Sequence, residues 1–182
     1  LCTYADSLTA FGNTVSSAYL RLVPNQEAPT RICWSDLNRS AMIRVPLGWS
    51  KVQDLAHVLN PNQQQTSYEN DARQTVELRS PDGSAIVHLL QAGITMAAQW
   101  GLTNKKSMKI AEQLYVSGNI FQDKKLLNQL PVLPKSCVES SNILLEKRNL
   151  YERETMFQNS IIEYVAKMLT DENDENMNSK LA

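Results

Sequence analysis

Several features that mark specialised protein classes are scarce or missing in this 182-residue chain. Its three cysteines, Cys2, Cys33 and Cys137, are scattered and form no CxxC pair. This pattern excludes a disulfide framework and a cysteine zinc site, and it favours a reducing, cytoplasmic setting. With 6 glycines and 7 prolines, the chain is neither collagen-like nor of low complexity. A Gly-rich phosphate loop is also missing from the sequence.

No charge of one sign dominates, and no long hydrophobic run is found. The 18 Lys and Arg against 19 Asp and Glu leave a net charge of −1, which argues against a nucleic-acid-binding or polybasic membrane surface. The longest apolar tract, residues 84–100, is too short and too polar to span a bilayer. Because the first residue is Leu rather than Met, we expect the chain to be part of a longer protein.

The basic residues that are present are unevenly distributed. Residues 1–103 contain six arginines and one lysine, whereas residues 104–182 contain nine lysines and two arginines. Arginine is preferred where a planar fork must grip a carboxylate or a phosphate, and lysine commonly solvates a surface. The first part of the chain is therefore a candidate for anion binding, with ordinary surface ion pairs as the alternative.

The hydrophobic patterns predict an α+β fold, with a small antiparallel sheet first and a helical C-terminal half. Residues 30–36 and 41–46 alternate like strands, so they predict a hairpin near 30–46. Residues 74–80 predict a third strand. The expected helices cover residues 4–22 in two pieces broken near Gly12, a stretch after Pro81 that ends or bends at Gly101, and residues near 104–117, 137–150 and 155–170. A loop of about 20 residues is expected before residue 137.

Glu77 and Arg79 are candidate functional residues of the third predicted strand. Strand alternation places them on one face about 7 Å apart and turns Val76 and Leu78 toward the core. Two interpretations are open. The pair forms an exposed surface ion pair, or Glu77 binds Mg²⁺ or Mn²⁺ beside an arginine anion clamp.

The hairpin and the loop before it carry further candidates. Arg39 lies at the predicted turn, and Arg44 lies between apolar strand residues, where it needs an anion or a water-facing sheet edge. Arg21 precedes a loop bounded by Pro24 and Pro29 that contains Glu27. A carboxylate in such a loop is solvated unless the loop closes over a reaction centre.

Three motifs in order resemble the C-terminal part of the glutamine synthetase catalytic domain. Residues 21–29 read RLVPNQEAP and resemble the family loop RLVPGYEAP. Residues 38–46 read NRSAMIRVP and resemble NRSAxIR[IV]P. Residues 76–82 read VELRSPD and resemble [IV]ExRx[PS]D, a segment that likewise precedes a long helix.

This resemblance implies a role for each candidate residue. Arg21 and Arg79 match arginines that bind the substrate glutamate, and Glu27 matches a flap residue that helps hold ammonium and takes up a proton. Arg39 matches a catalytic contact to the ATP phosphates and the γ-carboxyl group, and Arg44 matches a further ATP contact. Glu77 matches a ligand of one divalent metal.

The resemblance also implies a reaction and an assembly. The family joins glutamate and ammonia with ATP and Mg²⁺ or Mn²⁺, in sites built between subunits of a homo-oligomeric ring. Residues 1–170 are then part of the catalytic domain, residues 171–182 are a polar, frayed tail, and the chain alone is expected to be inactive and to retain no cofactor. Two alternatives stay open: a γ-glutamyl ligase for a larger amine, and a non-catalytic structural member, which the departures Asn25, Gln26 and Thr75 keep in play.

Overall fold

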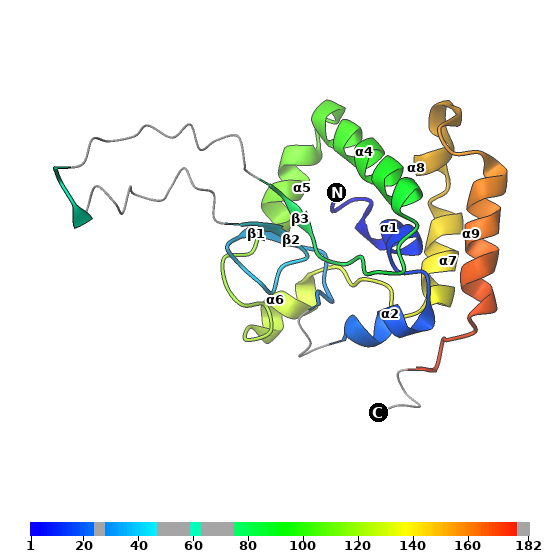
Figure 1. The fold of residues 1–182 in the computed structure, drawn as a ribbon, viewed down its shortest axis with the longest axis horizontal. Helices are drawn as coiled ribbons and strands as arrows, with labels where there is room; N and C mark the ends of the chain where they lie inside the picture. Colours follow the sequence, from blue (N-terminus) through cyan, green and yellow to red (C-terminus); the bar gives the residue numbers. More distant parts are fainter. Residues whose placement is uncertain (24–27, 47–58, 63–74, 178–182) are drawn as a thin grey trace.

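A group of helices packs beside a small three-stranded sheet in the computed structural model (Figure 1), which describes residues 1–23, 28–46, 59–62 and 75–177. This arrangement confirms the predicted α+β class with a helical C-terminal half. The described helices are α1 (Ala5–Gly12), α2 (Ser16–Arg21), α4 (Val87–Thr103), α5 (Ser107–Leu114), α6 (Lys124–Gln129), α7 (Cys137–Glu146), α8 (Asn149–Glu152) and α9 (Asn159–Asp171), with a 3-10 turn at Arg153–Thr155. None of them is long and apolar enough to cross a membrane.

The helices follow the predicted pattern with two corrections. The break after Gly12 is confirmed, but α4 continues through Gly101 to Thr103, so Gly101 does not end the helix. The loop expected before residue 137 contains α6, whose first turn is capped by Asp123. The Asp123 carboxylate accepts hydrogen bonds from the backbone amides of Lys125 and Leu126, which stabilises a short helix that its apolar pattern does not reveal.

The sheet has the strand order β1-β2-β3, with β1 at Trp34–Asp36, β2 at Ile43–Val45 and β3 at Glu77–Leu78. β1 and β2 are parallel, with Trp34 opposite Ile43, so the predicted hairpin is wrong. β2 and β3 are antiparallel, with Arg44 opposite Glu77. Alternation of apolar residues predicts strands but does not fix their direction.

The connection between β1 and β2 explains the parallel pairing. Leu37 leaves β1 with a φ of 56°, in the left-handed region, and its backbone amide donates to the carbonyl of Val45. The chain then turns back to the start of β1, and Ala41 and Met42 become fully buried on the way. Burial of these two side chains favours the return path over a tight hairpin.

The predicted faces of the third strand are half right. Leu78 packs against the small core cluster under the sheet, which contains Ile32, Met42 and Ile43. Val76 is 60% exposed, so its predicted burial is wrong. Val76 precedes a strand of two residues at the edge of the sheet, where no described element covers it.

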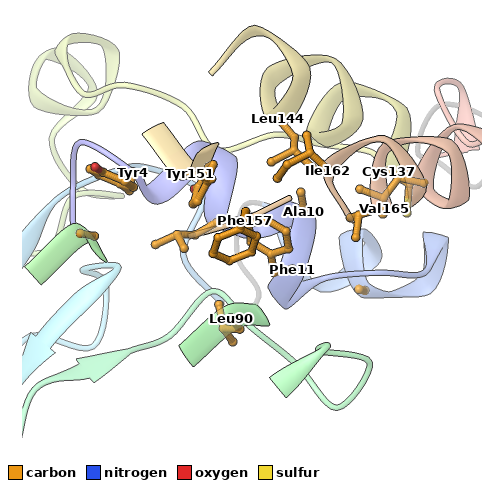
Figure 2. Close-up of a cluster of buried hydrophobic side chains, with 14 of the residues drawn as sticks. Tyr4, Ala10, Phe11, Leu90, Cys137, Leu144, Tyr151, Phe157, Ile162 and Val165 are labelled. Carbon is orange, nitrogen blue, oxygen red and sulfur yellow. The ribbon is translucent and has the colours of Figure 1, made fainter. Parts of the chain in front are cut away.

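The main core lies around α1, which is packed between α4 and the α7–α9 pair (Figure 1). Phe11 of α1 meets Tyr151 and Phe157, with ring centroids 5.2 Å and 5.5 Å away (Figure 2). The buried side chains of Ala18, Tyr19 and Leu22, in α2 and directly after it, join this core. Aromatic burial of this kind is a large source of stability.

Gly93 lets α4 approach this core closely, and enlarging it is expected to destabilise the chain. A Cβ atom at Gly93 would lie 2.8 Å from Leu8 Cδ2 and 3.3 Å from Tyr151 Cε1. Gly93→Val should therefore lower the free energy of unfolding by ~1–3 kcal/mol, measured by urea denaturation. Gly101→Val is the matched control in the same helix, because nothing lies within 4 Å of its Cβ position. Equal stability of the two variants would contradict the close approach.

Candidate anion-binding site

A cavity of about 530 Å³ opens where the loop after β1, strand β2 and the segment after β3 meet. The described residues that line it are Ala28, Arg39, Ser40, Arg44, Arg79, Asn119 and Phe121. Three of these are arginines, and none of the described lining residues is acidic. Such a surface suits a phosphate or a carboxylate group, because guanidinium forks match the planar or tetrahedral oxygens of these anions.

Arg79 connects the two walls of this cavity. Its Nη1 donates to the backbone carbonyl of Ala41 at 3.0 Å and also to that of Arg39. Its backbone amide donates to the carbonyl of Met42 at 3.0 Å. Arg79 therefore lines the cavity and also holds the loop that carries Arg39.

Arg44 and Glu77 form a bidentate ion pair across β2 and β3. Arg44 Nε donates to Glu77 Oε2 at 2.8 Å, and Arg44 Nη2 donates to Glu77 Oε1 at 3.0 Å. These hydrogen bonds lower the pKa of Glu77 and raise the pKa of Arg44, with weaker Coulombic help for Glu77 from Arg79. The main described partner of Glu77 is thus Arg44 on the neighbouring strand, rather than Arg79, two residues further along the chain.

Arg21 contacts the backbone that follows Arg79. It is not among the described lining residues. Its Nη2 donates to the carbonyls of Ser80 at 2.7 Å and Pro81 at 2.9 Å, and its Nη1 lies 3.5 Å from the carbonyl of Arg79. Arg21 therefore supports the backbone that follows Arg79. Its predicted contact with glutamate stays a prediction, as does the role of Glu27, which lies outside the described residues.

The cavity also contains residues that the sequence patterns did not indicate. Asn119 and Phe121 come from the loop after α5, about 80 positions from Arg39. Asn38 Nδ2 donates to the carbonyl of Gly118 at 2.7 Å, and the backbone amide of Ile120 donates to Ser40 Oγ at 3.2 Å. These bonds bring the loop to the cavity, and no local sequence signal announces such a long-range contact.

Comparison with known proteins places the chain in a family. Residues 1–180 match the family model described as glutamine synthetase, catalytic domain. The chain belongs to this family. It is 32% identical over 170 residues to a glutamine synthetase of Pyrococcus abyssi. This matched region is 92% of this chain and 33% of that protein. It is 37% identical over 102 residues to one of Helicobacter pylori, covering 56% and 17% of the two chains.

A solved structure supports the same fold. The cryo-EM structure of Plasmodium falciparum glutamine synthetase superposes with a TM-score of 0.63 at 21% identity, covering 95% of this chain and 37% of that chain. The chain spans about a third or less of the length of these glutamine synthetases.

The described residues of this glutamine synthetase family member do not by themselves fit a divalent metal. Across residues 1–23, 28–46, 59–62 and 75–177, no three His, Cys, Asp or Glu side chains come together. Glu77, the predicted ligand, has both carboxylate oxygens bonded to Arg44. Mg²⁺ in phosphate-handling sites needs carboxylates, phosphates and waters around it. Other ligands would have to come from outside the described residues.

The ion pair makes a pH prediction. Because Arg44 lowers the pKa of Glu77, the pair is intact above the ordinary glutamate range and is lost as pH falls through the lowered pKa. A carboxyl-carbon NMR titration of Glu77 should give a midpoint below the ordinary range. Arg44→Gln should raise that midpoint toward the ordinary value, with a residual depression from Arg79. Arg31→Gln is the control and should leave it unchanged; the same midpoint in Arg44→Gln would contradict the pairing.

Proposed function

We propose that the chain supplies part of the active site of an ATP-dependent glutamate–ammonia ligase. The observation that carries this proposal is the convergence of Arg39, Arg44 and Arg79 on one cavity in a glutamine synthetase catalytic-domain chain. In this reaction the γ-carboxylate of glutamate attacks the terminal phosphate of ATP, and ammonia then displaces phosphate from γ-glutamyl phosphate. Bound ATP supplies the phosphoryl group that activates the carboxylate.

The three cavity arginines match the demands of phosphoryl transfer. The reaction spreads negative charge over the phosphoryl oxygens, so positioning and cationic stabilisation account for most of the catalysis. Arg39 is proposed to contact the phosphates and the γ-carboxyl group. Arg44, held in place by its bidentate bond to Glu77, is proposed to contact the nucleotide phosphates. Because a rotating guanidinium loses more entropy on binding, this fixed orientation favours phosphate binding.

Glutamate recognition and water exclusion are assigned to other residues. Arg79 is proposed to clamp the α-carboxylate of glutamate from its position between the strand and the Arg39 loop. Arg21 is proposed to assist glutamate binding through its hydrogen bond to the backbone after Arg79. Glu27 is proposed to close over the acyl phosphate, exclude water and accept a proton from bound ammonium, which leaves ammonia as the nucleophile. Ala28, the next residue, lines the cavity, which supports a position near the reacting groups.

Metal and subunit partners are proposed for the complete protein rather than for this chain. The family match favours Mg²⁺ or Mn²⁺ and a homo-oligomeric ring, but no step is assigned to a metal because the described residues do not form its site. We therefore expect the 182-residue chain alone to make no glutamine.

A direct assay tests this function. The complete protein containing this chain, incubated with ATP, glutamate, ammonium and Mg²⁺, should form glutamine and ADP in equal amounts. The isolated chain should form no more glutamine than a heat-killed control. Product formed only with a bulky amine would identify a different γ-glutamyl ligase. If the complete protein forms neither a γ-glutamyl amide nor ADP with any amine, a catalytic role is contradicted and the protein is a non-catalytic member of the family.

A further inference from the structure

The first turn of α2 is held by a residue at the opposite end of the chain. α2 begins at Ser16, and its N-cap residue Val15 provides no side-chain cap. Instead, the backbone amide of Ser16 donates to Glu172 Oε2 at 2.8 Å, and Ser16 Oγ donates to the same oxygen. Glu172 therefore satisfies one of the first-turn backbone amides that have no acceptor within the helix.

The turn after α9 is shaped to make this contact. Asn173 has a φ of 47°, a left-handed conformation that asparagine tolerates better than most residues. On its other side, the buried Asp174 accepts hydrogen bonds from the backbone amides of Cys137 at 2.9 Å and Val138 at 3.2 Å, at the start of α7. Two carboxylates of one turn thus bind the first turns of two helices, and Asp174 fixes the position from which Glu172 reaches α2.

The carboxylate form of Glu172 fits this role. The Ser16 hydroxyl and then the Ser16 amide lower the pKa of Glu172, because both hydrogen bonds favour the charged acceptor. A six-residue helix is marginal without outside support. The contact from Glu172 therefore matters more to α2 than a similar contact would to a long helix.

The other end of α2 leads toward the cavity lined by Arg39, Arg44 and Arg79, here called the arginine cavity. Its last residue, Arg21, donates to the carbonyls of Ser80 and Pro81, directly after Arg79. Arg21 Nε is buried and has no hydrogen-bond partner among the residues that the structure describes. An unpaired buried donor costs free energy, which disfavours this position of the guanidinium. Other contacts must therefore hold Arg21 there, and we expect α2, which carries it, to contribute. α2 therefore links the end of α9 with the backbone that supports Arg79.

We propose that Glu172 is a positioning residue for the arginine cavity: it fixes the start of α2, and α2 fixes Arg21 against the backbone that carries Arg79. Its effect on anion binding rests on the proposed function, whereas its effect on α2 and on the Arg79 backbone does not. Tyr19 also holds α2, because its hydroxyl donates to Ser140 Oγ at 2.6 Å. Loss of Glu172 is therefore expected to loosen α2 without unfolding the chain.

Three variants of the complete protein that contains this chain test the proposal. Glu172→Ala removes the acceptor, Glu172→Gln retains an acceptor oxygen, and Glu175→Ala removes a nearby exposed carboxylate as the control. Hydrogen exchange of the α2 amides should be about fivefold faster in Glu172→Ala, which corresponds to the loss of a typical helix cap. Binding of inorganic pyrophosphate, measured by calorimetry, should weaken about threefold or more. Glu172→Gln should keep both the exchange rate and the pyrophosphate affinity close to wild type. Glu175→Ala should change neither quantity.

Each failure has a distinct meaning. Wild-type exchange of α2 in Glu172→Ala would overturn the anchoring role. Faster exchange of α2 with unchanged pyrophosphate binding would overturn the link to the cavity. If the wild-type protein binds no pyrophosphate, the proposed anion-binding function fails. The positioning role is then decided by the exchange rate of the Arg79 amide, which donates to the Met42 carbonyl. An Arg79 amide that exchanges at the wild-type rate in Glu172→Ala would then overturn the proposal, and faster exchange would support it.

Discussion

Glu27→Ala in the complete protein is expected to uncouple ATP cleavage from glutamine formation. Glu27 belongs to the sequence segment between Pro24 and Pro29. The residue that follows it, Ala28, lines the cavity that contains the three arginines. If Glu27 accepts the ammonium proton, its loss should slow amide formation by ~10²–10⁴-fold, the usual contribution of a positioned general base. Phosphoryl transfer should largely continue, so water should destroy the acyl phosphate. The measurement is the amount of glutamine formed per ADP released, which should fall steeply.

A neighbouring variant separates the role of Glu27 from a general effect on the loop. Gln26→Ala changes the adjacent side chain and is expected to keep most of the coupling between glutamine and ADP. A wild-type ratio and a normal rate in Glu27→Ala would mean that Glu27 is only a solvated loop residue. A similar loss in both variants would assign the effect to loop conformation instead of the carboxylate.

Arg79→Ala is expected to give the second large effect, mainly on glutamate binding. A hydrogen bond to a charged group contributes ~1.5–3 kcal/mol, so the KM for glutamate should rise about tenfold or more. The structure adds a second cost, because the buried carbonyl of Ala41 loses the Arg79 donor and the Arg39 loop loses support. The measurement is the KM for glutamate and for ATP in the complete protein. Both should rise, with the larger change for glutamate.

Arg31→Ala is the matched control for this experiment. Arg31 is another partly buried arginine whose Nη1 lies 3.5 Å from a backbone carbonyl, that of Leu130. It is not among the described residues that line the cavity. Its loss should leave the KM for glutamate near the wild-type value. An unchanged KM in Arg79→Ala would contradict the position of Arg79 in the substrate site.

The parts of the fold that the sequence predicts are those with strong local patterns. The apolar stripe of α4 and the break after Gly12 appear where periodicity and glycine place them. The pairing of β1 with β2 is different, because it depends on where Ala41 and Met42 become buried. Their burial depends on residues distant in sequence, because Met42 packs in a cluster with Ala5 and Leu133, and Ala41 packs in one with Val116. Strand direction therefore could not be predicted from alternation alone.

The candidate site shows the same division. Arg39, Arg44 and Arg79 lie in short motifs that stand out in the sequence, and the structure brings them to one cavity. The Arg44–Glu77 pair could not be predicted, because it requires the register of β2 against β3. Glu172 lies in a polar segment expected to fray, yet it binds Ser16 through the fold of the whole chain.

The most direct test of the central claim is a structure of the complete protein with glutamate and an unreactive ATP analogue. We expect the terminal phosphate to lie in the cavity lined by Arg39, Arg44 and Arg79, with guanidinium nitrogens ~2.7–2.9 Å from anionic oxygens. We also expect the α-carboxylate of glutamate to bind Arg79. A nucleotide bound elsewhere, with this cavity holding neither phosphate nor glutamate, would contradict it.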